Sequence, residues 1–277
     1  MTTMTRTKGY IFTVVAAALY VGLGVIFSDG LFDLGNFWSS EYVSEGTWLS
    51  YLLLALIIVG GVYQANRIPE SGTTISAGSE GGEGQIHDPV WWKLLLGNTY
   101  LAVLWLPLRF YVGQAWLTAG EHKVRDGAWM DGGTALQGYW TGAVTVNEQT
   151  GKTRITYAWF QDFIQYMLDH EWYTWFAKLV AIGEVLVGLG LLVGALVGIA
   201  AFFGTVLNFN FMLAGTVSTN PVLFGLTVFL VLGWKVAGWL GLDRYLLPML
   251  GTPWQLGEVA GPRKDAPIIG RQPKVTH

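Results

Sequence analysis

Long uncharged stretches are the feature that most limits what this chain can fold into. Residues 9–27 and 48–65 contain no Asp, Glu, Lys or Arg, and a helix of about 20 apolar residues crosses the roughly 30 Å hydrocarbon layer of a bilayer. The 277-residue chain is 52% hydrophobic and only 13% charged, which is about half the charged share of a soluble domain. The sequence therefore predicts an integral membrane protein built from helices.

Six stretches are apolar enough to predict transmembrane helices. Besides the first two, they are residues 94–124, 172–194, 197–216 and 221–242. Pro107 removes a backbone donor inside the third stretch, so we expect a kink there. The fold class that we expect is an all-α integral membrane protein. Its spans three to six form a four-helix core, and spans one and two form a flank beside it.

Composition divides the chain into four parts. Residues 1–66 form the two-helix membrane segment, and residues 67–90, rich in Gly, Ser, Thr and Glu, form a flexible linker. Residues 91–254 form the four-helix membrane core, and residues 255–277 are a polar tail. Within the core, residues 125–171 are expected to be an outer loop that ends in an interfacial helix.

That interfacial helix is predicted from an amphipathic pattern. Trp159, Phe160, Phe163 and Ile164 recur at helical spacing with polar residues between them. Such a helix lies in the membrane interface with its apolar face toward lipid or protein. It is expected to anchor the surface or, alternatively, to cover a site.

The distribution of Lys and Arg predicts the orientation. Cytoplasmic loops carry the excess of basic residues. One side of the predicted topology carries Arg6, Lys8, Arg67, Lys93, Arg244, Arg263, Lys264, Arg271 and Lys274. The other side carries Lys123, Arg125, Lys152 and Arg154 among many acidic residues. We therefore expect a multi-pass protein of the cytoplasmic (inner) membrane with both termini in the cytoplasm.

Two ionisable side chains lie well inside predicted spans. Arg109 and Glu184 each lie about 10 residues from the outer end of their span, or roughly 15 Å deep. Charges at this depth are costly and usually have a partner or a function. We therefore expect Arg109 and Glu184 to form an ion pair, whether structural or functional, with Asn208, Asn210 and Lys235 at similar depth.

The outer end of the third span carries His122 and Lys123, which are expected to attract anions. The chain has no cysteine, which excludes thiolate metal sites and iron–sulfur clusters within it. Its four histidines include no i, i+4 pair, and no haem, flavin or nucleotide motif is present. We therefore expect no metal site. A net charge of −3 gives no reason to expect a nucleic-acid partner.

Several motifs occur in one order within residues 91–254. They are Arg109-x3-Gly113-x2-Trp116-Leu117-x2-Gly120-x2-Lys123, Glu184-x3-Gly188, Asn208-Phe209-Asn210-Phe211-Met212-x-Ala214-Gly215, Ser218-Thr219-Asn220-Pro221 and Trp239-x3-Asp243-Arg244-Tyr245-Leu246-Leu247-Pro248. This order resembles the DoxX/DoxD family, whose DoxD members are the large membrane subunit of thiosulfate:quinone oxidoreductase. The first two spans and the linker lie outside the resemblance.

The resemblance implies oxidation of thiosulfate to tetrathionate, with a membrane quinone as electron acceptor and a second, smaller subunit as partner. For this reaction we expect catalytic roles for Arg109, Glu184 and His122. The residues expected to bind substrate or quinone are Lys123, Asn208, Asn210, Lys235 and Trp116. Glu184 or His122 would move the protons that quinone reduction requires.

Two other functions are compatible with the sequence. One is a non-catalytic accessory or assembly subunit that packs into a larger respiratory or photosynthetic membrane complex through its glycine-rich spans. A small-anion transporter is less favoured, because the sequence shows no inverted repeat or paired broken helices.

Overall fold

The computed structural model describes residues 2–27, 47–75 and 88–251, and nearly all the regular structure in these ranges is helical. The long helices are α1 (Arg6–Phe27), α2 (Thr47–Asn66), α4 (Leu106–Arg125), α8 (Tyr173–Val193), α9 (Val197–Leu213) and α10 (Asn220–Leu232). The shorter ones are α3 (Val90–Gly97), the 3₁₀ helix η2 (Thr99–Trp105), α5 (Gly127–Met130), α6 (Thr134–Val144), α7 (Ala158–Asp169), α11 (Trp234–Ala237) and α12 (Asp243–Met249). Strands β1 (Thr2–Met4) and β2 (Thr73–Ile75) pair antiparallel.

Three of the described helices are long and apolar enough to cross a membrane, namely α1, α2 and α8. A fourth span results if α3 is counted together with the stretch formed by η2 and α4, although α3 and that stretch meet at a bend of 83°. Helices α9 and α10 are apolar but shorter. The all-α fold class is confirmed and its apolar helices fit a lipid bilayer, whereas the count of six spans stays a prediction.

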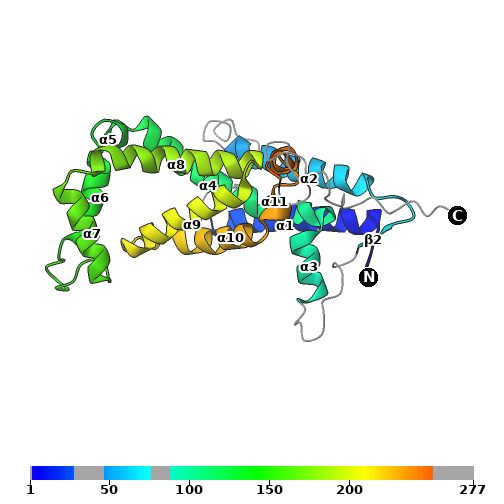
Figure 1. Cartoon of the computed structure of the whole chain (residues 1–277), viewed down its shortest axis with the longest axis horizontal. Coiled ribbons are helices and arrows are strands. Elements are labelled where there is room, and N and C mark those ends of the chain that lie inside the picture. The colour runs from blue at the N-terminus through cyan, green and yellow to red at the C-terminus, as the bar shows by residue number, and fades with distance from the viewer. Residues whose placement is uncertain (1, 28–46, 76–87, 252–277) are drawn as a thin grey trace.

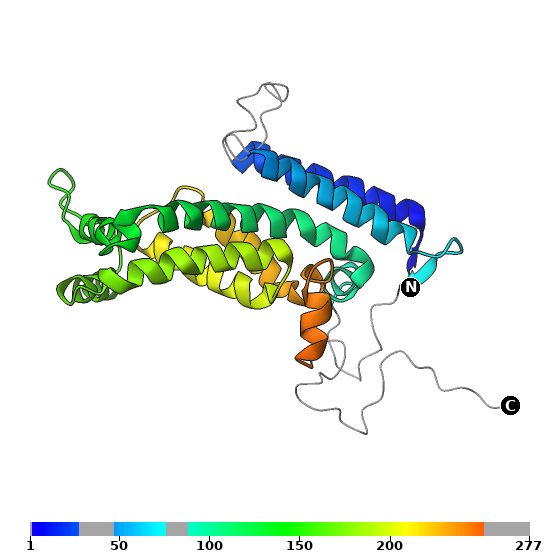
Figure 2. The same cartoon turned by 90° about the horizontal axis from the view of Figure 1, so that it is seen from above.

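The long helices share one general direction, and short helices lie across both ends (Figure 1). Helix α3 lies at one end, near the start of α1, and α6 and α7 lie at the opposite end, nearly perpendicular to α8. The view from above shows the α1–α2 hairpin beside α4, on the side away from α8 (Figure 2). We call these two ends the α3 end and the α7 end.

The third predicted span is not one helix. Asn98 has extended backbone dihedrals, and its side chain accepts a hydrogen bond from Tyr100 N, which ends α3 and begins η2. Pro107 lies in the first turn of α4, where a proline leaves no helical acceptor unpaired. The expected kink at Pro107 is therefore wrong, and the bend lies about two turns earlier, at Asn98.

Helices α4 and α8 are antiparallel and pack with their backbones in close contact. A side-chain carbon at Gly188 would lie 2.5 Å from the backbone nitrogen of Leu117, and one at Gly120 would lie 2.6 Å from that of Val185. Such distances leave no room for any side chain, so these glycines set the separation of the two helices. Small residues serve this purpose in membrane helix pairs.

The sixth predicted span also breaks. Helix α10 ends at Leu232, and the ring of Trp105 packs so closely on Gly233 that no side chain fits there. Lys235 lies in the next short helix, α11, and is exposed. Residues 221–242 are therefore not one continuous helix, and the depth expected for Lys235 stays a prediction.

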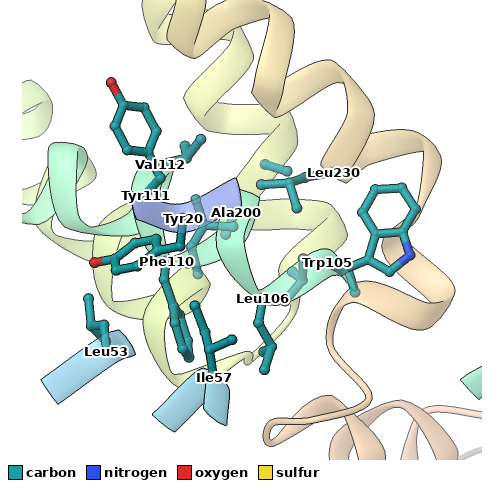
Figure 3. Close-up of a cluster of buried hydrophobic side chains, with 14 of the residues drawn as sticks. Tyr20, Leu53, Ile57, Trp105, Leu106, Phe110, Tyr111, Val112, Ala200 and Leu230 are labelled. Carbon is teal, nitrogen blue, oxygen red and sulfur yellow. The ribbon is translucent and has the colours of Figure 1, made fainter. Parts of the chain in front are cut away.

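The N-terminal hairpin is joined to the core by buried apolar and polar contacts. Tyr20 and Leu53 belong to the same buried cluster as Phe110 of α4 (Figure 3). The Tyr20 hydroxyl donates to Gln114 Oε1 at 2.8 Å, and Gln114 Nε2 donates to Ser50 Oγ at 2.9 Å. Strand β2 lies inside residues 67–90, the segment predicted as a linker.

Residues 125–171 contain three helices. The amphipathic helix predicted there is α7, whose Phe160, Ile164 and Met167 pack in one buried cluster with α6, while Trp159 and Phe163 are exposed. Helices α5 and α6 occupy sequence that was expected to be loop.

Candidate functional site

The expected ion pair between Arg109 and Glu184 does not form. Along the antiparallel pair α4–α8, Arg109 lies beside Gly194, whereas Glu184 lies beside Gly120. The ten residues from Glu184 to Gly194 correspond to about 15 Å along a helix. The prediction failed because it counted about 10 residues from Arg109 to the outer end of its span, whereas α4 continues for 16 residues past Arg109, to Arg125.

Arg109 is held at the α3 end by backbone carbonyls. Its side chain is 2% exposed, Nη1 donates to Ala237 O at 2.8 Å, and Nη2 donates to Leu240 O at 3.0 Å. These carbonyls lie at the end of α11 and in the turn before α12, so the guanidinium joins that part of the chain to α4. The contacts favour the structural alternative for Arg109.

Asp243 lies in the same region and holds the turn between α8 and α9. Its carboxylate accepts hydrogen bonds from Leu196 N at 2.5 Å and Val197 N at 2.9 Å, the first amides of α9. Gly194 and Leu196 both have left-handed backbone dihedrals in this turn. Burial raises the pKa of Asp243, and the two amides and the charge of Arg109 oppose that shift.

Glu184 pairs with a residue that the depth argument had placed elsewhere. Lys123 Nζ lies 2.6 Å from Glu184 Oε2, and the side chains are 19% and 1% exposed, respectively. Lys123 lies in the last turn of α4, and its ammonium group lies 5.1 Å from the ring centre of Trp129 in α5. Glu184 Oε1 is buried and has no hydrogen-bond partner. The pair thus connects the α7 end with the interior of the core.

Asn208 and Trp116 lie within about one helical turn of the level of Glu184, where α4, α8 and α9 meet. A side-chain carbon at Gly204 would lie 3.1 Å from Trp116 Nε1 and 3.2 Å from Val187 Cγ1, so the three helices meet there. Asn208 is one turn from Gly204, and Glu184 is one turn from Val187, both toward the α7 end. The indole nitrogen of Trp116 and both side-chain polar atoms of Asn208 are buried without hydrogen-bond partners.

We refer to Lys123, Glu184, Asn208 and Trp116 as the polar cluster. Four of its buried polar atoms lack a partner among the described residues. An unpartnered buried polar group costs about 1–3 kcal/mol, and natural proteins keep few of them. A cluster of such groups is therefore a candidate for function.

A groove of about 650 Å³ borders the polar cluster. It lies between α6, α7, α8 and α9, and its lining is mainly apolar and aromatic, with Tyr139 and Asn210 among the few polar side chains. Phe211 lines the groove and also contacts Trp116, with 6.4 Å between ring centres. Val187, which packs at the level of Trp116, lines it as well.

Tyr139 is the polar aromatic residue of this groove. Its hydroxyl lies 2.6 Å from Thr216 Oγ1, and its ring meets Phe211 edge to face. Burial raises the pKa of Tyr139, with the hydrogen bond to Thr216 and the charge of Arg154 opposing the shift. The phenol therefore stays protonated through neutral and moderately alkaline pH. The sequence analysis did not single out Tyr139, because nothing near it in sequence marks a site.

The remaining predicted site residues lie outside the polar cluster. His122 is exposed, and Asn210 is exposed on the groove, where its amide donates to Val206 O at 2.8 Å. Arg125 forms an ion pair with Glu121 at 2.5 Å. Because Arg125 and Lys123 are each paired with a carboxylate, the α7 end has less free positive charge than the sequence led us to expect.

In the described ranges, no group of three or more His, Asp or Glu side chains is arranged to hold a metal ion. Comparison of the chain with protein-family models, curated proteins and solved structures gives no match.

Proposed function

We propose that this chain is the membrane subunit of a quinone-linked oxidoreductase that converts thiosulfate to tetrathionate. The observation that carries the proposal is the groove beside the polar cluster: an apolar, aromatic slot next to buried polar groups without partners. The order of motifs that resembles the DoxX/DoxD family supports thiosulfate as the electron donor.

The reaction balances without a further oxidant. Two thiosulfate ions each lose one electron, and a sulfur–sulfur bond joins them as tetrathionate. The quinone gains these two electrons and takes up two protons to become the quinol. The protein must therefore bind an apolar acceptor, admit an anionic donor and supply protons.

The groove fits a quinone in size and chemistry. Its volume lies within the roughly 300–1,000 Å³ of typical ligand pockets, which combine apolar walls with a few placed polar groups. Phe211 offers a ring for stacking, and the Tyr139 hydroxyl and the Asn210 amide offer hydrogen bonds to the carbonyl oxygens. Leu186 and Phe203, which line the groove and are exposed, would border the isoprenoid tail. When bound, the quinone supplies the two-electron acceptor chemistry.

The same proposal includes six spans in the cytoplasmic membrane with both termini inside. Arg6, Arg67, Lys93 and Arg244 belong to elements at the α3 end. The sequence after α12 adds four more basic residues. The positive-inside rule then places the α3 end in the cytoplasm and the α7 end outside.

The donor side of the reaction favours a partner. Lys123 and Arg125 are both paired, so the C-terminal end of α4 offers a dianion little unpaired positive charge. We propose that a second, smaller subunit completes the thiosulfate site there.

An accessory or assembly subunit of a larger respiratory or photosynthetic complex is the second candidate, and one observation favours it. The α1–α2 hairpin carries a second groove of about 820 Å³, lined by Ala18, Gly22, Ile58 and other apolar residues. A side chain at Gly22 would meet nothing within 4 Å, so this small-residue surface is not used for packing inside the described fold.

The test is quinone reduction by the purified full-length chain, alone and with proteins that co-purify with it. Thiosulfate and a short-chain quinone are added, and quinol formation is followed by absorbance. We expect turnover, with a higher KM for quinone in Asn210→Leu and an unchanged KM in Asn66→Leu, an Asn change on α2. No turnover by a folded chain with its partner present would favour the accessory function.

A further inference from the structure

The polar cluster has an arrangement that quinone binding alone does not require. Its members lie on three helices at successive levels: Lys123 near the end of α4, then Glu184 in α8 and Asn208 in α9, then Trp116 about two turns from Lys123 in α4. The series begins at a partly exposed ammonium group and ends at an indole that is 3% exposed.

The unpartnered atoms all belong to the inner part of this series. Within the described part of the chain, Glu184 Oε1, both polar atoms of the Asn208 side chain and Trp116 Nε1 have no hydrogen-bond partner. In a membrane no lipid atom can satisfy them, and each needs a donor or an acceptor. Buried water commonly fills this role and makes about three hydrogen bonds to otherwise unsatisfied groups.

We infer that Lys123, Glu184, Asn208 and Trp116 line a hydrated proton path from the α7-end surface to the groove. This inference rests on the proposed function, because quinone reduction consumes two protons. Of the polar groove residues, Asn210 is an amide without a titratable proton and Tyr139 carries a single phenol proton that it shares with Thr216, so both protons of each turnover must be supplied from water. The polar cluster meets the groove at Phe211 and Val187, which border both.

Each member has a distinct role in this path. Lys123 holds the Glu184 carboxylate at the surface end, where the ring of Trp129 covers the ammonium group. Glu184 is the proton-carrying group, as carboxylates are in membrane proton relays. Asn208 and Trp116 hold the water that continues the path; they are positioning residues. The exposed His122 lies outside the series.

The first test needs no turnover. Hydrogen exchange of the indole N–H groups is measured on the reconstituted, ¹⁵N-tryptophan-labelled full chain, with Trp116→Phe to assign the Trp116 signal. Trp105 is the matched control, since it is also 3% exposed but donates to Leu95 O at 3.0 Å. We expect the Trp116 proton to exchange about tenfold faster than that of Trp105, because exchange reports access to water.

Variants then locate the entry to the path. Lys123→Met is expected to change the exchange rate of the Trp116 indole proton by about tenfold, because removing the ammonium group alters the access of water at that position. Lys178→Met, which changes an exposed lysine of α8, is expected to leave that rate unchanged. Equal protection of Trp116 and Trp105, or exchange that Lys123→Met does not alter, would overturn the path.

The second test uses proteoliposomes with thiosulfate, quinone and pH indicators on each side. We expect protons to be taken from the α7 side, and Glu184→Gln to lower quinol formation about tenfold with the KM for thiosulfate unchanged. Glu121→Gln is the matched surface control. Turnover with protons drawn from the α3 side refutes the path and leaves the proposed function standing. Fast Trp116 exchange without any turnover keeps the path and refutes the proposed function.

Discussion

The two ends of the α4–α8 pair differ in how far their buried polar groups are paired. At the α3 end, both carboxylate oxygens of Asp243 and two of the three guanidinium nitrogens of Arg109 bind backbone amides and carbonyls that close turns, and Arg109 Nε is the one atom of these two groups without a partner among the described residues. At the α7 end, Glu184 has one paired and one unpaired oxygen, and neither side-chain polar atom of Asn208 has a partner among the described residues. The first arrangement fastens the fold. The second costs stability, so its retention calls for a function.

The largest effect on stability is expected at the α3 end. Arg109→Ala removes the donors to Ala237 O and Leu240 O and leaves the buried Asp243 without a nearby cation. Breaking a buried charged arrangement of this kind costs about 3–5 kcal/mol. We expect this loss in the free energy of unfolding in mixed micelles. A loss below about 1 kcal/mol would be that of a surface contact and would contradict the assigned role.

The next effect concerns the cap of α9. Asp243→Ala leaves Leu196 N and Val197 N without acceptors, and the loss of an N-terminal cap costs about 1–2 kcal/mol. The same unfolding measurement checks it. Asp243→Asn is the control, because an amide oxygen still accepts one of these hydrogen bonds and should preserve part of the stability.

At the α7 end a stabilising change is expected. Asn208→Leu replaces two unpartnered polar atoms with apolar atoms of similar volume, and we expect a gain of about 1 kcal/mol in the free energy of unfolding. Quinone reduction should fall in the same variant, since stability and activity conflict at functional sites. A destabilised Asn208→Leu protein would indicate that Asn208 serves the fold, as Arg109 does.

The smallest expected effect is the coupling energy between pairs of variants, which compares the two ends directly. Because Arg109 and Glu184 lie far apart, their alanine variants should be additive within about 0.5 kcal/mol. The Lys123 and Glu184 variants should instead show a coupling of about 1 kcal/mol or more. Both double-mutant cycles use the same unfolding assay, and strong coupling between Arg109 and Glu184 would restore the pair that the sequence predicted.

Local patterns were sufficient to predict most helices. The uncharged stretches correspond to α1 and α2, and the amphipathic spacing around Phe160 corresponds to α7, because burial and helical period act on neighbouring residues. The break at Asn98 also had a local signal: Gly97-Asn98-Thr99 combines a helix-ending residue with a helix-starting one. That signal was outweighed by the apolar composition around it.

The candidate site was predictable only in part. Glu184, Lys123, Asn208 and Trp116 were singled out by type and depth, and the structure brings them together. Their pairing was not predictable, because local sequence does not give the register in which α4 and α8 pack: α4 continues for 16 residues past Arg109, whereas α8 begins 11 residues before Glu184. Asp243 carried no signal for its role at all, since its partners lie 46 and 47 residues earlier in the chain.

That distance in sequence has a consequence for biosynthesis. Synthesis begins at the N-terminus, so α8 and α9 are made before the carboxylate that caps their turn. Until residue 243 has been made, the left-handed backbone of Leu196, at φ 49°, lacks the acceptor that stabilises it. The α8–α9 hairpin, and the polar cluster that depends on its register, therefore reach their final form only when almost all of the described chain has been made.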